Sequence, residues 1–179
     1  MLTNKEINEN KIKYLELMSQ LHFDMTNISA YLDAVGYFEA PYTTQYLRAY
    51  PGGLCQTALE FYNALKATTE TYLPGVYTEE DLLKVALFRN MYRAEMYEYN
   101  PNKNCYQTKK DRPTYGDLGF SSYMTARHFV DFTDEQVLAI CHGSASNTSI
   151  DIHEIRLDYP LVTLVTITEL LINLKNKGQ

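Results

Sequence analysis

Apolar residues recur at intervals of three or four along much of this chain, which is the spacing of one face of an α-helix. In the N-terminal part the pattern predicts two amphipathic helices, over residues 4–21 and 24–35, and Gly36 is placed to end the second. A polar loop rich in aromatic residues follows. It leads to Pro51-Gly52-Gly53, which is typical of a turn, and to a third helical pattern that ends near Tyr72.

Capping residues predict where three later helices begin. Thr78 has the side chain of an N-cap and is followed by acidic residues, and the helix after it is apolar almost all round, which indicates a central buried helix. Thr133 and Gln136 have the spacing of a capping box for a short helix that ends near His142. Pro160 suits the first turn of a last helix, which runs to about residue 176.

The remaining segments complete the predicted fold. Alternating residues on both sides of a turn at 100–104 predict a small β-hairpin, a further helix is expected over 121–130, and the polar segment 143–158 is expected to be a loop. We therefore expect a mostly α-helical single domain over residues 1–179. It would be a bundle of about seven helices with one β-hairpin inserted after the fourth.

Composition narrows the class of protein. Hydrophobic residues make up 45% of the chain and charged residues 21%, which is ordinary for a soluble domain. The net charge of −6 does not favour nucleic acid as a partner. The three cysteines are widely spaced, with no CxxC pair, which suits a reducing compartment such as the cytoplasm. No segment approaches the roughly 20 apolar residues of a membrane span, so no membrane partner is expected.

Tyrosine is unusually frequent, with 16 residues against 7 Phe and no Trp. Because a Tyr ring combines apolar area with a polar tip, these residues suit pocket walls and contact surfaces. A Tyr-rich surface around the hairpin, with Tyr97, Tyr99 and Tyr106, is therefore a candidate for contact with a protein partner. The alternative is that A/T-rich codon usage alone explains the tyrosines, and the abundance of Asn and Lys agrees with that.

Two stretches of the loop and turn carry a resemblance to a known family. Residues 38–44 read FEAPYTT and residues 49–54 read AYPGGL. From Gly36 onward the chain resembles the HD-domain superfamily of metal-dependent phosphohydrolases, in particular the small HD proteins encoded by bacteriophages and prophages. The resemblance implies an HD-like fold for residues 36–179, with 1–35 as additional N-terminal helices.

The same resemblance indicates where the metal ligands of the family would fall. The family binds one or two metal ions through His side chains, a His-Asp doublet and a distant Asp. Here those positions are Leu47, Thr57, Arg89-Asn90, Leu118 and Glu169, or Thr168 if the register shifts by one residue, and only His142 lies near a family His. Leu47 cannot bind a metal, and the fixed cation of Arg89 repels one. The resemblance therefore implies the fold without the activity, and no metal, cofactor or catalytic residue is expected.

The residues at the former metal pocket support two interpretations. Together with the basic residue that follows the doublet, the candidate ligand-binding residues are Thr57, Arg89, Asn90, Arg93, His142 and Glu169. Arginine offers a planar fork of donors, so the pocket could bind a phosphate, a nucleotide or a carboxylate. Alternatively, Arg89 pairs with Glu169 and fills the space left by the metal, since a buried cation needs a partner.

Three functions follow for the whole chain. The first is a catalytically inactive HD protein, a pseudoenzyme that acts as a binding or protein-interaction module. The second is a sensor that binds a nucleotide or phosphate in the former metal pocket. The third is a phosphohydrolase with a rearranged metal site, using His142 with acidic residues. Separately, His142, Asp151 and His153 lie in or beside one loop and are candidates for an unrelated metal site. The alternative is that His142 is a helix-end residue, where the helix dipole favours a partly positive ring.

Overall fold

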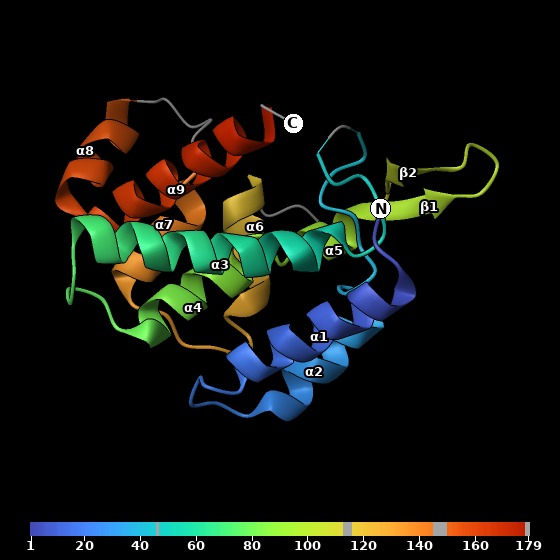
Figure 1. Ribbon diagram of the computed structural model, residues 1–179, viewed down its shortest axis with the longest axis horizontal. Helices are drawn as coiled ribbons and strands as arrows, with labels where there is room; N and C mark the ends of the chain where they lie inside the picture. Colours follow the sequence, from blue (N-terminus) through green and yellow to red (C-terminus); the bar gives the residue numbers. More distant parts are fainter. Residues whose placement is uncertain (46, 113–115, 145–149, 178–179) are drawn as a thin grey trace.

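Helices make up most of the chain, and the sheet found among the described residues is one two-stranded antiparallel hairpin (Figure 1). The computed structural model describes residues 1–45, 47–112, 116–144 and 150–177, without the side chains of 150–153 and 176–177. The helices are α1 (Asn4–Met18), α2 (Met25–Ala34), α3 (Gly53–Tyr72), α4 (Glu79–Phe88), α5 (Arg93–Met96), α6 (Leu118–Ala126), α7 (Asp134–His142), α8 (Ile150–Asp158) and α9 (Pro160–Lys177). The strands are β1 (Tyr97–Asn100) and β2 (Cys105–Thr108).

The predicted fold class is confirmed. All seven predicted helices are present, as α1, α2, α3, α4, α6, α7 and α9, and the hairpin lies where alternation placed it. Tyr97 pairs with Thr108 and Asn100 with Cys105 in its register. The hairpin is shorter than expected, because Arg93–Met96 forms one helical turn, α5, before β1 begins.

One prediction about the chain is wrong. The segment expected to be a loop, 143–158, contains helix α8, Ile150–Asp158. The apolar residues at 150, 152, 155 and 157 do not gather on one face of a helix, so the sequence lacks an amphipathic pattern there. The helix packs on α9, where Thr163 donates a hydrogen bond to the carbonyl of Arg156. Packing on a neighbouring helix therefore stabilises a segment whose own pattern does not predict a helix.

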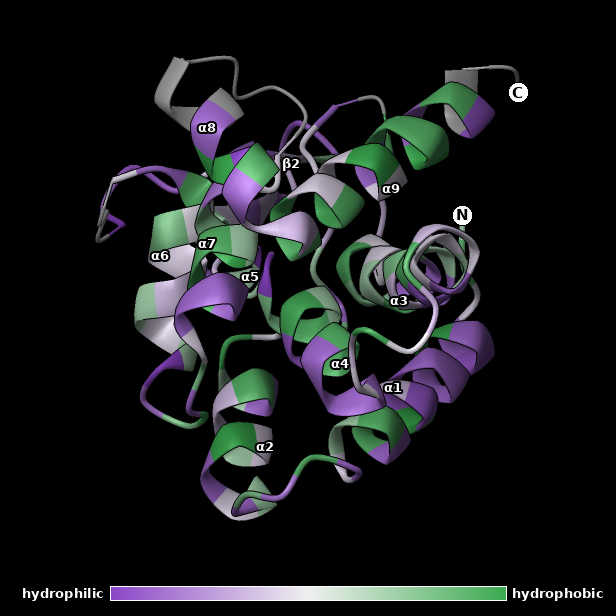
Figure 2. Ribbon diagram, turned by 90° about the vertical axis from the view of Figure 1, so that its left-hand side faces the viewer, coloured by the Kyte–Doolittle hydropathy of each residue, from purple (hydrophilic) through white to green (hydrophobic). Residues whose placement is uncertain are grey.

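Helix α3 is the centre of the bundle. It packs against α4, α9 and α1, and Figure 1 shows it crossing the middle of the molecule. Residues of α3 and α4 that face the interior are apolar and buried, among them Leu54, Leu65, Leu83 and Leu87. Much of α1 is hydrophilic in Figure 2, but its buried Tyr14 reaches the end of α4 and donates a hydrogen bond to the carbonyl of Leu87 at 2.9 Å. The core thus holds the end of α4, which leads into the candidate site.

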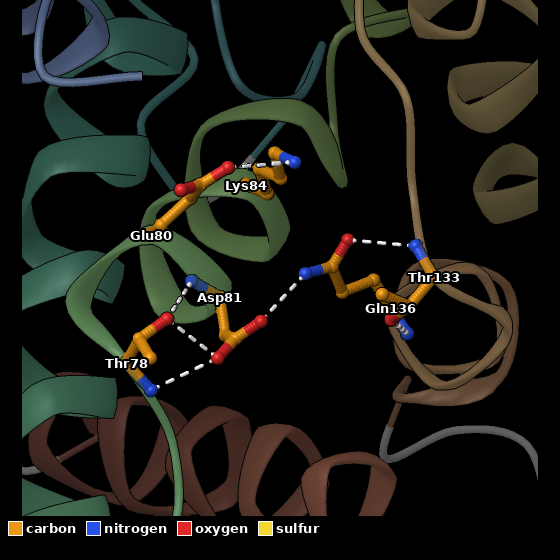
Figure 3. A network of polar contacts seen from close by, with 6 residues as sticks. All are labelled: Thr78, Glu80, Asp81, Lys84, Thr133 and Gln136. Atoms are coloured by element: carbon orange, nitrogen blue, oxygen red, sulfur yellow. Dashed lines mark hydrogen bonds and ion pairs between the residues drawn. The ribbon is translucent and has the colours of Figure 1, made fainter. Parts of the chain in front are cut away.

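Two capping boxes fix the starts of α4 and α7 and are joined to each other (Figure 3). Thr78 caps α4 and its hydroxyl contacts Asp81 at 2.6 Å. The other carboxylate oxygen of Asp81 accepts a hydrogen bond from Gln136 Nε2 at 2.8 Å, and Gln136 Oε1 accepts one from the amide of Thr133 at 3.0 Å. Both helix starts are therefore satisfied locally, as the sequence predicts, and α4 is tied to α7.

The loop before α3 has an irregular backbone held by its own hydrogen bonds. Arg48 adopts a left-handed conformation with φ 54°, and Gly52 has φ 81°. The amide of Tyr42 donates to the carbonyl of Arg48 at 3.1 Å, and the amide of Leu54 donates to the carbonyl of Ala40 at 3.0 Å. These bonds bring residues 40–42 beside the start of α3, and they place the Arg48 side chain over that helix.

Candidate functional site

Two buried arginines lie beside α3, each paired with a carboxylate. Arg89, at the end of α4, is 7% exposed and its Nη2 lies 3.0 Å from Glu169 Oε2 on α9. Its guanidinium also stacks on the ring of Phe61, 4.1 Å from the centroid. The ion pair between Arg89 and Glu169, one of the two interpretations of the sequence, is therefore present.

The second buried arginine is Arg48, which the sequence analysis did not single out. It is 9% exposed and forms an ion pair with Glu60 on α3. Its Nη1 donates to Thr57 Oγ1 at 3.0 Å, while the Thr57 hydroxyl donates to the carbonyl of Gly53 at 2.6 Å. The hydroxyl of Thr57 is therefore already satisfied from both sides.

Most positions that the HD resemblance assigns to metal ligands meet at two adjoining cavities. Leu47, Thr57, Arg89 and Glu169 all line a narrow cavity of about 20 Å³, and Arg48 lines it too. That volume is room for about one water molecule. Arg89, Asn90, Leu118 and Glu169 line the neighbouring, larger cavity. The remaining position, His142, lines neither cavity.

The larger cavity, which we call the Arg89 pocket, has a volume of about 390 Å³. It is bordered by the end of α4, by α5, by the start of α6, by the end of α7 and by α9. Its charged and polar lining includes Arg89, Asn90, Arg93, Asp117, Cys141 and Glu169. This volume falls near the lower end of the range of small-molecule sites, about 300–1,000 Å³.

Arg93 enters this pocket with only neutral partners among the described residues. Its Nε donates to Asn90 Oδ1 at 3.2 Å, and its Nη1 donates to the carbonyl of Tyr42 at 2.8 Å and to the hydroxyl of Tyr97 at 3.2 Å. The guanidinium also lies over the Tyr42 ring, 4.2 Å from its centroid. The side chain is held in place, yet no carboxylate of the described part of the chain forms an ion pair with it.

Asp117 and Cys141 both line the same pocket. Asp117 is the N-cap of α6, where its Oδ1 accepts from the amide of Phe120 at 2.8 Å. Burial, and to a lesser extent the negative charge of Asp117, raise the pKa of the Cys141 thiol to about 11. The thiol is therefore protonated near neutral pH and unsuited to act as a nucleophile.

Of the metal cluster proposed from the sequence, only the His142 side chain lies in the part of the chain that the structure describes. His142 ends α7, and its buried Nδ1 has no hydrogen-bond partner among the described residues. The side chains of Asp151 and His153 lie outside the described residues, so the cluster proposed with His142 stays a prediction. Elsewhere in the part of the chain that the structure describes, no three His, Cys, Asp or Glu side chains group as a metal site would require.

A metal ion of the HD type does not fit the residues at the two cavities. Arg48 and Arg89 place fixed positive charges on the wall of the narrow cavity, and Leu47 offers no ligand atom. The hydroxyl of Thr57, which the resemblance assigns to the first His position, is occupied by hydrogen bonds. Metal-bound phosphate chemistry therefore has no support from these side chains.

The hairpin forms a second candidate surface. It extends beyond the helices at the right-hand side of Figure 1. Tyr99 and Tyr106 pack edge to face on it, with ring centroids 5.4 Å apart, and Tyr99 is 51% exposed. Tyr97 lies at the base of β1, where its hydroxyl accepts from Arg93. The three tyrosines named from the sequence thus join the pocket to an exposed aromatic tip.

Two larger grooves lie on the surface of α3. One, of about 600 Å³, runs between α1 and α3 and is lined by several exposed acidic side chains, including Glu6, Glu9 and Glu16. The other, of about 740 Å³, lies between α3 and the end of α9 and reaches Arg48. Neither groove is lined by residues of the Arg89 pocket, and Leu47 and Arg48, which line the narrow cavity, also line the second groove.

Comparison of the chain with family models, with curated proteins and with solved structures gave no match. The resemblance to HD proteins therefore stays a prediction. None of the helices in the described residues has both the length and the apolar character needed to cross a bilayer.

Proposed function

We propose that this chain is a catalytically inactive HD-fold protein, of the kind that phages encode, that works in the cytoplasm as a binding module. The observation that carries the proposal is the meeting of Leu47, Thr57, Arg89 and Glu169 at one narrow cavity. These residues come from three separate parts of the sequence, and the resemblance alone assigns them to one metal centre. Two guanidinium groups line that cavity, which supports loss of metal binding with retention of the fold.

The binding activity that we propose belongs to the Arg89 pocket. The charge of Arg89 is neutralised by Glu169, so Arg89 mainly forms part of the pocket wall. Arg93 supplies a positive charge that forms no ion pair with a described carboxylate, and hydrogen bonds to Asn90 and Tyr42 orient it. A guanidinium held in this way is suited to a phosphate or carboxylate group. The pocket therefore favours a small anionic ligand, such as a nucleotide, a phosphate ester or a carboxylic acid.

Thermal unfolding with added anions tests this binding. Inorganic phosphate, mononucleotides and dicarboxylates should include at least one compound that raises the melting temperature. Ligand present at one hundred times its Kd stabilises the folded state by about 2.7 kcal/mol. Arg93→Gln should remove the shift. Arg127→Gln, which removes a charge at the far end of α6, should keep it. Shifts that survive Arg93→Gln would place the anion elsewhere and contradict the proposal.

Metal analysis tests the proposed loss of catalysis separately. Purified protein should hold far less than one Mn, Fe or Ni ion per chain after incubation with each metal and gel filtration. Stoichiometric metal, accompanied by hydrolysis of a phosphomonoester or nucleotide, would overturn the pseudoenzyme proposal and favour a phosphohydrolase with a rearranged site.

The exposed hairpin favours a second candidate function, contact with a protein partner. Tyr99 and Tyr106 present adjacent rings on an element that extends from the bundle, and such rings often anchor interfaces. Tyr99→Ser and Tyr106→Ser should weaken the binding of any partner that uses this surface, without changing the thermal stability of the bundle by more than a few degrees. A partner that binds both variants with unchanged Kd would exclude the hairpin as its contact.

A further inference from the structure

The Arg89 pocket contains one positive and one negative group that are not paired with each other. Arg93 lies on α5 and Asp117 precedes α6, and both line the pocket. No ion pair joins them, and neither has another charged partner within ion-pair distance among the described residues. The other two charges of the lining, Arg89 and Glu169, neutralise each other. The pocket is therefore balanced overall but carries separated charges of opposite sign.

Each of these two groups retains free hydrogen-bonding capacity. The Nε and Nη1 groups of Arg93 are used by Asn90, Tyr42 and Tyr97, and no acceptor among the described residues is assigned to Nη2. The Oδ1 atom of Asp117 accepts the amide hydrogen of Phe120 at the start of α6. The Oδ2 atom accepts no assigned hydrogen bond from the described residues. Asp117 is exposed, which places its carboxylate at the mouth of the pocket, whereas Arg93 is half-buried.

Separated charges of this kind select against a simple anion. A phosphate or carboxylate that approaches Arg93 also experiences the repulsion of Asp117. A ligand that carries a protonated amine as well removes this penalty, because the amine can pair with Asp117. The negative charge of Asp117 acts within the pocket, since Cys141 also lines it and the charge contributes to raising the pKa of the Cys141 thiol.

We infer that the natural ligand of the Arg89 pocket is a small zwitterion, with a carboxylate or phosphate bound by Arg93 and a protonated amine bound by Asp117. This inference rests on the proposed binding function and specifies its ligand. The volume of about 390 Å³ suits a molecule the size of an amino acid or an amino-phosphate ester. Asn90, whose side-chain carbonyl is engaged by Arg93, keeps its amide N–H groups for the anionic end.

Matched ligands that differ only in the amine test the inference. Isothermal titration should compare L-glutamate with glutarate, and O-phosphoethanolamine with ethyl phosphate, so that carboxylate and phosphate sources are distinguished. In at least one pair the amine should tighten Kd about fivefold, the upper range for a partly exposed ion pair. The wild-type protein is used throughout as the reference.

Two variants test whether Asp117 and Arg93 are the residues that bind the amine and the anionic group. Asp117→Asn removes the charge but keeps a good N-cap, so α6 should remain folded, and circular dichroism checks this. In this variant the two members of the pair should bind within about twofold of each other. Arg93→Gln should abolish binding of both members.

The outcomes separate the two proposals. If the amine-free anion binds as tightly as the zwitterion and Arg93→Gln still abolishes binding, the zwitterion inference is overturned and the proposed anion-binding function stands. An amine effect that persists in Asp117→Asn overturns the assignment to Asp117. If none of the four ligands binds in the millimolar range, the zwitterion inference fails. The anion-binding function then depends on the thermal-unfolding test with inorganic phosphate and mononucleotides.

Discussion

A Cβ atom on Gly53 would overlap the carbonyl oxygen of Arg48, because the loop before α3 passes directly over the first turn of that helix. The same carbonyl accepts the amide of Tyr42 at 3.1 Å. The side chain of Arg48, anchored by this backbone, reaches Thr57 one turn further along α3. The shape of the loop and the position of the buried Arg48 guanidinium therefore both require a residue without a side chain at position 53.

Gly53→Ala is expected to destabilise the fold strongly. The methyl group meets backbone, which cannot rotate away, so the loop must shift and the Arg48–Thr57 contact is lost. We expect a loss of about 2–4 kcal/mol in the free energy of unfolding, measured with urea. Gly75→Ala is the matched control, since Gly75 has φ 75° and open space around it. It should cost only about 1 kcal/mol, from the left-handed backbone alone. Equal losses in the two variants would contradict the steric argument.

Breaking the Arg89–Glu169 pair from one side should cost more than replacing both partners. Glu169→Leu leaves a cation that is 7% exposed without its carboxylate, so the free energy of unfolding should fall by about 3 kcal/mol. In the double variant Arg89→Met with Glu169→Leu, the thioether packs on Phe61 in place of the guanidinium. The double variant should therefore be more stable than Glu169→Leu alone. A strictly additive loss in a double-mutant cycle would show that the pair is not coupled.

Only one of the three cysteines should react quickly with a thiol reagent. Cys105 is exposed on β2, whereas Cys55 and Cys141 are buried. Burial raises the pKa of Cys55 to about 12 and that of Cys141 to about 11, so few thiolates form at pH 8. Titration with a chromogenic disulfide should release one equivalent rapidly and two slowly, and Cys105→Ser should remove the rapid phase. Rapid reaction of all three thiols in one phase would contradict the burial of Cys55 on α3 and Cys141 on α7.

The hydrogen bonds that Asp81 accepts from Thr78 and Gln136 make stability depend on pH in the acid range. Burial alone would raise the pKa of Asp81, but hydrogen bonds from Thr78 and Gln136 outweigh it and lower the pKa below its ordinary value of 3.8. A lowered folded-state pKa gives stability that is fully present above the unfolded value. That stability is lost as the pH falls through the folded value.

Asp81→Asn measures this contribution. The variant should be less stable than the wild type at pH 7, and the difference should shrink when the urea midpoints are compared at pH 3. Glu80→Gln removes a neighbouring first-turn carboxylate that is 41% exposed and pairs with Lys84, 2.9 Å away on the next turn of the same helix. This control variant should lower the free energy of unfolding by less than about 0.5 kcal/mol at neutral pH. A difference between Asp81→Asn and the wild type that does not change with pH would argue against the titration of Asp81.

The fold was predictable where the determinants are local. Thr78 and Thr133 cap their helices within three residues, and Gly36 ends α2 with φ 67°, so the sequence alone indicates these boundaries. Helix α8 depends on α9, and no periodicity within Ile150–Asp158 reveals it. Local chemistry thus predicts helix ends better than it predicts helices that are stabilised by a neighbour.

The candidate site was predictable only through the resemblance. Arg89 and Glu169 are 80 residues apart, and nothing in spacing or composition brings them together. Arg48 was missed because its contact with Thr57 needs a left-handed backbone that the sequence of a non-glycine residue does not suggest. Asp117 was missed because its place in the pocket is set by the close packing of α6 on α7, where Gly119 lies against the backbone of Cys141.

Arg93 holds three parts of the chain through one guanidinium group: the carbonyl of Tyr42 in the first loop, Asn90 after α4, and the hydroxyl of Tyr97 at the base of the hairpin. A mutation at this position is therefore pleiotropic, since it alters the pocket and the anchoring of the hairpin in one step. Over evolution, the ligand preference of the pocket and the orientation of the aromatic tip are expected to drift together.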